Sequence, residues 1–286
     1  MSSFRFGGEV HRFGETASTQ ELALAAAAAG AGEGTLFLAE SQTRGRGRHG
    51  HAWSSPPGAG LYASLVLRPR RPAAELPVLT LAAGLAVADA VRMVAGVEPE
   101  LRWPNDLLLQ GRKFCGLLLE AATGGEGPVP GQAQHRLGAV GPPSRCEPSG
   151  MWGEAPQGPA PINAAALGFG INLRHQEWPP ELAPIATALD DHAAQPVLSD
   201  ALCDAVLRQL ERRYAAWSTG DGPALLREFE ARAPAVRGCE VAVGASDGAA
   251  AAYRGRTEGL EPSGFLRVRL PGGELRVVVS GDVRPV

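Results

Sequence analysis

The chain has 286 residues, enough for one large domain with a smaller companion or for two domains. Its 44% of hydrophobic and 20% of charged residues are typical of a globular protein. A net charge of -3 and an isoelectric point near 6.1 argue against a general nucleic-acid binder, which is usually basic. No run reaches about 18 consecutive apolar residues, and the first residues lack the apolar core of a signal peptide, so we expect a cytoplasmic protein. The four cysteines form no CxxC pair and predict neither a zinc site nor a disulfide framework.

The first part of the chain alternates predicted strands with two predicted helices. Ser18 and Thr19 precede an alanine-rich run that ends near Gly30, and a Ser or Thr in that place is a helix N-cap signal. Apolar residues at spacings of three and four predict a second helix over Pro77–Val94. Gly111 separates two apolar runs and predicts the turn of a hairpin. The predicted strands are Val10–Phe13, Thr35–Ala39, Tyr62–Leu67, Leu101–Trp103, Leu107–Leu109 and Phe114–Glu120.

The rest of the chain begins with a segment of different composition. Residues Thr123–Asn163 are dense in Gly and Pro and lack apolar periodicity, so they predict a disordered insertion. A strand is predicted over Ala164–Leu173, followed by helices over Ser199–Trp217 and Pro223–Ala231. From Gly238 onward, short apolar runs alternate with turns and predict a small all-β barrel.

The first motif that carries chemistry is a run rich in glycine and arginine, Gly45–Gly50 (GRGRHG). Its three glycines let backbone N–H groups approach an anion closely. Arg46 and Arg48 add forked donors that suit phosphate and carboxylate groups. The motif is not a P-loop, because the Lys-Ser/Thr ending is absent. It suits a loop that folds over a phosphorylated intermediate, although the hexamer alone favours a solvated basic turn or an RGG-like nucleic-acid contact.

The second motif is Arg102–Asp106 (RWPND), with Lys113 seven residues beyond it. Pro104 favours a rigid turn between two strands. Asn105 and Asp106 can bond to backbone groups, ligand hydroxyls or a hydrated cation. Lys113 begins an apolar strand, where a cation can point inward at a ligand and a phosphate would offset the electrostatic cost. The alternative is a hairpin with an Asx-turn and surface cations.

Two shorter motifs complete the set. Gly168–Asn172 (GFGIN) lies inside a predicted strand, where glycines often mark the close approach of a ligand or backbone. The alternative for this motif is a bulge in a sheet. Ser18–Gln20 caps the first helix, and the free N–H groups at a helix start can also bind anions.

These blocks, in this order, resemble the biotin protein ligase family. The family pattern is a Ser-Thr before the first helix, a Gln before GRGRxG, a KWPND block with a downstream Lys, and a GxGIN strand. The matching residues are Ser18–Thr19, Gln42, Gly45–Gly50, Trp103–Asp106, Lys113 and Gly168–Asn172, and Ala186–Leu189 is similar to the family's ATSL segment. The resemblance implies an α+β catalytic domain over residues 1–232, with a mixed sheet and flanking helices like a class II aminoacyl-tRNA synthetase. It also implies an SH3-like barrel over residues 234–286.

The resemblance implies an ATP-dependent ligase that activates biotin as biotinyl-5'-AMP, releases pyrophosphate, and passes biotin to a lysine of a biotin carboxyl carrier protein. Its cofactors would be ATP and Mg²⁺, and Asn105, Asp106 and Asn172 would serve the nucleotide side and the metal. Arg48 and Lys113 would be catalytic, lying by the biotin carboxylate and the α-phosphate and neutralising their charge. The loop would be mobile without ligand and would close over the adenylate to exclude water. The residues implied to bind biotin or adenylate are Ser18, Thr19, Gln20, Gln42, Gly45, Arg46, Gly47, Arg48, Trp103, Asn105, Asp106, Lys113, Gly116, Gly170 and Asn172.

The chain departs from the family pattern at three places. Arg102 stands where the family usually has Lys, which keeps the charge and changes its geometry. The segment Thr123–Asn163 replaces a short connection. No winged-helix segment precedes Val10, so we expect the ligase-only form, with no DNA or membrane partner and no role as a transcriptional repressor. A homodimer is left open.

Three other functions compete with this interpretation. A lipoate ligase of the same fold is disfavoured because WPND and GRGRHG match the biotin branch. A nucleic-acid-binding module is disfavoured by the acidic isoelectric point and the lack of an aromatic stacking platform. An inactive, biotin-binding regulator is disfavoured because Arg48 and Lys113 are both present.

Overall fold

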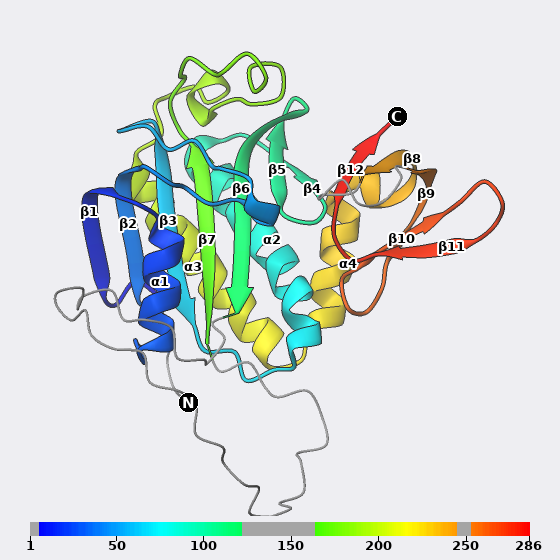
Figure 1. Cartoon of the computed structure of the whole chain (residues 1–286), viewed down its shortest axis with the longest axis horizontal. Coiled ribbons are helices and arrows are strands. Elements are labelled where there is room, and N and C mark those ends of the chain that lie inside the picture. The colour runs from blue at the N-terminus through cyan, green and yellow to red at the C-terminus, as the bar shows by residue number, and fades with distance from the viewer. Residues whose placement is uncertain (1–5, 122–163, 245–252) are drawn as a thin grey trace, which may run out of the picture.

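A computed structural model describes residues 6–121, 164–244 and 253–286, which form two sheets (Figure 1). The predicted insertion Thr123–Asn163 lies outside the described residues. The larger sheet has the strand order β1-β2-β3-β7-β6-β5-β4. It is mixed, because β1 and β2 are parallel and every other neighbouring pair is antiparallel. Its strands are β1 (Val10–Thr16), β2 (Leu36–Gln42), β3 (Gly60–Leu67), β4 (Glu100–Arg102), β5 (Asp106–Leu109), β6 (Arg112–Ala121) and β7 (Ala165–Asn172).

Helices cover both faces of this sheet. Helix α1 packs on one face, and α2 and α3 pack on the other (Figure 1). Successive side chains of β2 point to opposite faces of the sheet. Leu36 and Leu38 join the core under α2 and α3, while Phe37 joins the smaller core under α1. The helices are α1 (Thr19–Ala28), α2 (Leu76–Ala95), α3 (Ser199–Ser218) and α4 (Gly222–Arg232).

Helix α2 is the centre of the larger core. It is long and apolar enough to cross a membrane, but 72% of its most apolar window is buried inside the protein. Its small side chains, such as Ala82, Ala83 and Ala86, are fully buried, and α3 packs against the helix. Burial against other elements therefore accounts for its apolar composition.

The C-terminal part forms a separate five-stranded antiparallel sheet with the order β11-β10-β9-β8-β12. Its strands are β8 (Arg237–Gly244), β9 (Tyr253–Leu260), β10 (Leu266–Arg269), β11 (Leu275–Val278) and β12 (Asp282–Pro285). Buried Trp103 links the two parts, because its Nε1 donates to the carbonyl of Gly264 at 3.0 Å. The predicted fold class, a mixed sheet with flanking helices plus a small C-terminal β domain, is confirmed. The division near residues 232–234 stays a prediction.

Candidate active site

The strand register places three residues of the predicted site in one row across the larger sheet. Asp106 of β5 pairs with Gly116 of β6, Gly116 pairs with Gly170 of β7, and Gly170 pairs with Tyr62 of β3. A cavity of about 370 Å³ lies over this row and reaches Thr19 at the start of α1. Residues that are far apart in sequence thus meet because neighbouring strands carry them.

Most of the predicted site residues line this cavity. They are Thr19, Gln20, Gln42, Arg46, Gly47, Arg48, Asn105, Asp106, Lys113, Gly116, Gly170 and Asn172. The structure does not bring Ser18, Gly45 or Trp103 into the lining. Ser18 caps α1 by accepting from the N–H of Glu21, and Trp103 packs in the core. A ligand contact stays a prediction for these three residues and for the residues of the lining.

The arginine loop, residues 43–53, folds back on itself as a short hairpin beside the cavity. Arg46 and Ala52 form an antiparallel bridge, and the N–H of Gly47 donates to the carbonyl of His51 at 2.7 Å. The N–H of Trp53 donates to Gly45 at 2.9 Å. A Cβ at Gly45 would lie 2.4 Å from the Trp53 carbonyl oxygen, so only glycine lets the two arms approach this closely. Movement of the loop on ligand binding stays a prediction.

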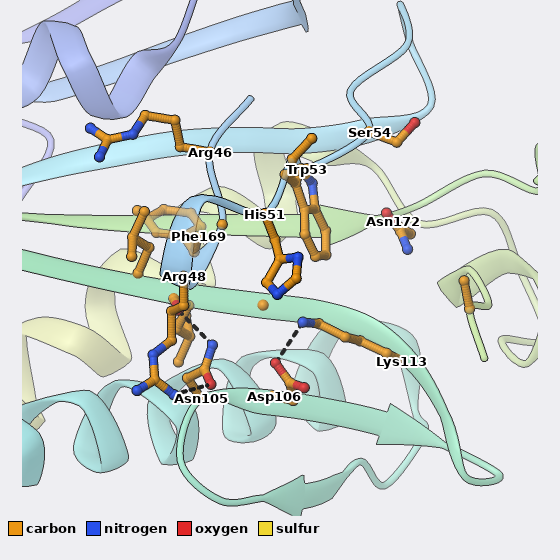
Figure 2. Close-up of a pocket in the computed structure, with 18 of the residues that line it drawn as sticks. Arg46, Arg48, His51, Trp53, Ser54, Asn105, Asp106, Lys113, Phe169 and Asn172 are labelled. Atoms are coloured by element: carbon orange, nitrogen blue, oxygen red, sulfur yellow. Dashed lines mark hydrogen bonds and ion pairs between the residues drawn. The ribbon is translucent and has the colours of Figure 1, made fainter. Parts of the chain in front are cut away.

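The side chain of Arg48 ties the end of the loop to the second motif. Its Nη1 donates to Oδ1 of Asn105 at 3.0 Å (Figure 2). Asn105 is held in turn, because its Nδ2 donates to the carbonyl of Leu117 at 2.9 Å. Burial lowers the pKa of Arg48 and nearby Asp106 opposes this, but a guanidinium stays charged at neutral pH. The pocket thus contains a partly desolvated cation that can stabilise an anion.

Asp106 is the counter-charge of two further cations. Its Oδ1 forms an ion pair with Nζ of Lys113 (Figure 2), at 2.6 Å, and its Oδ2 accepts from Nη2 of Arg102 at 2.6 Å. Burial raises the pKa of Asp106, but Lys113 and Arg102 outweigh burial and hold it below the ordinary value of 3.8. The inward cation predicted at Lys113 is therefore compensated by a carboxylate as well as by any bound phosphate.

We expect Asp106→Asn to lower the free energy of unfolding by about 1.5–3 kcal/mol at pH 7, because two cations lose a charged hydrogen-bond partner. The pKa of Asp106 is lower in the folded than in the unfolded state, so its stabilisation is present above pH 3.8 and is lost as the pH falls through the folded pKa. Urea unfolding of both proteins between pH 7 and pH 3 measures this. The difference in the free energy of unfolding between the wild type and Asp106→Asn should begin to shrink below pH 3.8. A variant as stable as the wild type at pH 7 would contradict the ion pairs.

Trp53 is a site residue that the sequence motifs did not indicate. Its indole ring lies over the sheet glycines, where a Cβ at Gly170 would come within 2.5 Å of the ring and one at Gly116 within 2.9 Å. The ammonium group of Lys113 lies 5.3 Å from the ring centroid, within range of a cation–π contact. The close approach at Gly170 of the GFGIN strand is therefore made by a side chain of the arginine loop. A tryptophan in a polar, glycine-rich loop was the available signal.

We expect Gly170→Ala to lower the free energy of unfolding by about 1–3 kcal/mol, because the new methyl group overlaps the Trp53 ring. Gly14→Ala is a matched control in the same sheet, since a Cβ there meets nothing within 4 Å. The control should change stability by less than about 0.5 kcal/mol. Urea unfolding measures both, and equal stabilities of the two variants would contradict the packing of Trp53 on Gly170.

Neutral hydrogen bonds hold the end of the cavity near α1. Oε1 of Gln42 accepts from the backbone N–H of Thr19 at 2.8 Å and from its hydroxyl at 3.1 Å. Nε2 of Gln42 donates to Ser55 at 2.8 Å, and the hydroxyls of Thr19 and Ser64 lie 2.9 Å apart. This network gives the Ser-Thr motif and the predicted Gln a common position in space.

The segment Ala186–Leu189 adjoins the cavity, which Ala186 lines. The N–H of Lys113 donates to the carbonyl of Ile185 at 2.7 Å, and the N–H of Thr187 donates to the carbonyl of Lys113 at 3.0 Å. Nδ2 of Asn172 donates to the carbonyl of Thr187 at 3.1 Å. Two backbone hydrogen bonds thus join the downstream lysine to this part of the chain, and the side chain of Asn172 joins the GFGIN strand to the ATSL-like segment.

The family model described as the biotin/lipoate A/B protein ligase family matches residues 16–127. A biotin--[acetyl-CoA-carboxylase] ligase from Mycobacterium tuberculosis is 31% identical over 242 residues, covering 82% of this chain and 72% of that protein. The chain belongs to the biotin protein ligase family. The bifunctional ligase/repressor BirA of Bacillus spizizenii is 28% identical over 233 residues, which are 81% of this chain. The chain spans only 60% of that relative's length.

A solved structure agrees with this membership of the biotin protein ligase family at the level of the fold. The biotin protein ligase from Aquifex aeolicus in complex with biotin and ATP superimposes with a TM-score of 0.74. The match covers 98% of this chain and 100% of that one, at 22% sequence identity. It therefore extends over both the larger sheet and the C-terminal sheet.

Proposed function

We propose that this chain is an ATP-dependent biotin protein ligase that forms biotinyl-5'-AMP, releases pyrophosphate, and transfers biotin to a lysine of a biotin carboxyl carrier protein. One observation carries the proposal: a single cavity gathers Thr19, Arg48, Lys113 and Asn172, which come from four separate motifs. The two relatives are named as ligases, one of them for acetyl-CoA carboxylase. A cytoplasmic location and the absence of a DNA-binding, repressor or membrane role belong to the same proposal, and the net charge of -3 disfavours nucleic-acid binding.

The charges of the cavity suit a reaction between two anions. A carboxylate and a triphosphate repel each other, so catalysis must neutralise them and hold them in line. Arg48 and Lys113 supply fixed positive charge in the cavity, each already oriented by a partner side chain. Both side chains are therefore positioned in the protein before the reaction, and such preorganisation is the condition for strong electrostatic catalysis.

The thiol nearest to the site has little support as an enzyme nucleophile. Cys115 lies next to the strand glycines but is fully buried and outside the cavity lining. Burial raises the pKa of its thiol, so the reactive thiolate is disfavoured. Direct attack of the substrate carboxylate on ATP, with no covalent enzyme intermediate, fits the site better.

The described residues do not form a Mg²⁺ site of their own. No group of three or more His, Cys, Asp or Glu side chains in the described ranges could hold a metal ion. Both oxygens of Asp106 are engaged by Lys113 and Arg102. Since Mg²⁺ is usually bound through substrate phosphates with few protein ligands, it would enter this site with ATP.

Adenylation in the absence of a carrier tests the proposed substrate. The purified protein is incubated with ATP, Mg²⁺ and either biotin or lipoate, and the acyl-AMP is separated by chromatography. We expect acyl-AMP with biotin and, in competition, a clear preference for biotin over lipoate. Preferred use of lipoate would replace the proposal with a lipoate ligase. If no acyl-AMP formed with either acid, the proposed adenylation would be refuted.

A further inference from the structure

Glu120, near the end of β6, holds two residues that line the cavity although it does not line the cavity itself. Its Oε1 forms an ion pair with Nη2 of Arg46 at 2.9 Å. Its Oε2 accepts a hydrogen bond from Nε2 of Gln20 at 3.0 Å. One carboxylate thus connects the arginine loop to the start of α1.

The contact with Glu120 helps to set the orientation of the Gln20 amide. Gln20 is 3% exposed, and its Nε2 also lies within 3.1 Å of the Ala166 carbonyl and 3.4 Å of the Leu118 carbonyl. With three acceptors around the NH₂ group, the carbonyl Oε1 must point the other way. It lies over Gly168, where a Cβ would come within 2.6 Å of it. Oε1 has no protein partner within the described residues, so the cavity floor presents a buried acceptor.

The contact with Arg46 holds the first arm of the arginine loop. Arg46 forms the antiparallel bridge with Ala52, so its position sets the hairpin of residues 45–53. The second attachment is Arg48, which donates to Asn105 on the far side of the cavity. Arg46 and Arg48 are therefore two of the points at which the loop is held, and the geometry of each depends on a residue outside the loop.

We propose that Glu120 is a positioning residue for the reaction of this cavity, holding the arginine loop through Arg46 and orienting the amide of Gln20. This inference rests on the proposed function. The side chains of Arg46 and Glu120 are 39% and 28% exposed, so their ion pair is partly screened by solvent. Loss of the carboxylate should accordingly speed the release of bound biotinyl-AMP by about threefold to tenfold.

The test compares Glu120→Gln, Arg46→Gln and the double variant with the wild type, by the rate at which preformed biotinyl-AMP leaves the protein. If both residues act through one ion pair, the double variant should release the adenylate more slowly than the product of the two single effects would give, because the pair is lost only once. Glu75→Gln is a matched control, because its pair with Arg71 is similarly exposed at 33% and lies outside the cavity lining. The proposal would be overturned if Glu120→Gln released biotinyl-AMP at the wild-type rate. It would also be overturned if the increases in release rate of the two single variants multiplied in the double variant.

Hydrogen exchange of the protein without nucleotide gives a second readout that does not depend on activity. In Glu120→Gln the backbone amides of residues 45–53 should exchange faster than in the wild type and in Glu75→Gln, while the melting temperature stays within about 2 °C. Unchanged exchange in the loop would overturn the proposed role of Glu120. If the wild type formed no biotinyl-AMP but the loop still exchanged faster, the proposed function would fail while the attachment by Glu120 stood.

Discussion

Lys113→Ala is expected to reduce biotin-dependent adenylation by about 10²–10³-fold, the usual cost of removing one preorganised electrostatic contact. Lys113 lies in the cavity lining and is oriented by Asp106 and by the ring of Trp53. The alanine variant removes a positive charge and also leaves the Asp106 carboxylate partly uncompensated. A carboxylate and a triphosphate would then meet additional negative charge at the point where they must approach each other.

Biotin-dependent exchange of labelled pyrophosphate into ATP measures this step directly. Arg112→Ala is the matched control, since Arg112 is the preceding residue on β6 and does not line the cavity. The control should keep adenylation within a few-fold of the wild type. Equal rates of pyrophosphate exchange by Lys113→Ala and the wild type would show that Lys113 has no role in adenylation.

Arg48→Gly is expected to form biotinyl-AMP but to release it about 10–100 times faster than the wild type. The arginine loop is held over the cavity by the charged hydrogen bond from Arg48 to Asn105, and a bond of this kind contributes about 1.5–3 kcal/mol. Once released, the mixed anhydride reacts with any accessible amine. Lysines of a bystander protein should therefore become biotinylated in the presence of the variant.

Arg44→Gly makes the same change of residue type four positions earlier. Arg44 is 72% exposed, pairs with Glu21 at 3.4 Å and does not line the cavity, so adenylate retention should be preserved. Western blotting for biotin on the bystander, together with the release rate of biotinyl-AMP, separates the two variants. An Arg48→Gly variant that holds the adenylate as tightly as the wild type would show that this arginine has no role in retention.

Local signals were sufficient for most of the fold. Ser18 caps α1 as the sequence predicted, and the hairpin between β5 and β6 turns at Gly111, where φ is +74°. These features depend on neighbours in the sequence, so a pattern of a few residues contains the information. The predicted boundaries of the strands and helices differ from the observed ones by a few residues, because tertiary contacts influence where each element ends.

The candidate site was predicted as a set of motifs but not as a geometry. GRGRHG, WPND and GFGIN are recognisable in the sequence, whereas the row that joins Asp106 to Gly170 exists only through the strand register. Trp53 and Glu120 were missed for the same reason. Each acts through partners more than 60 residues away, such as Gly116 and Arg46, and no local pattern records such a contact.

Intact-mass measurement of a carrier domain tests the proposed ligase activity most directly. The wild-type protein is incubated with a biotin carboxyl carrier domain, biotin, ATP and Mg²⁺, with biotin or ATP omitted in parallel reactions. We predict that the carrier gains the mass of one biotinyl group, on a single lysine, only when biotin and ATP are both present. A carrier of unchanged mass in the complete reaction would contradict the assignment of this cavity to biotin transfer.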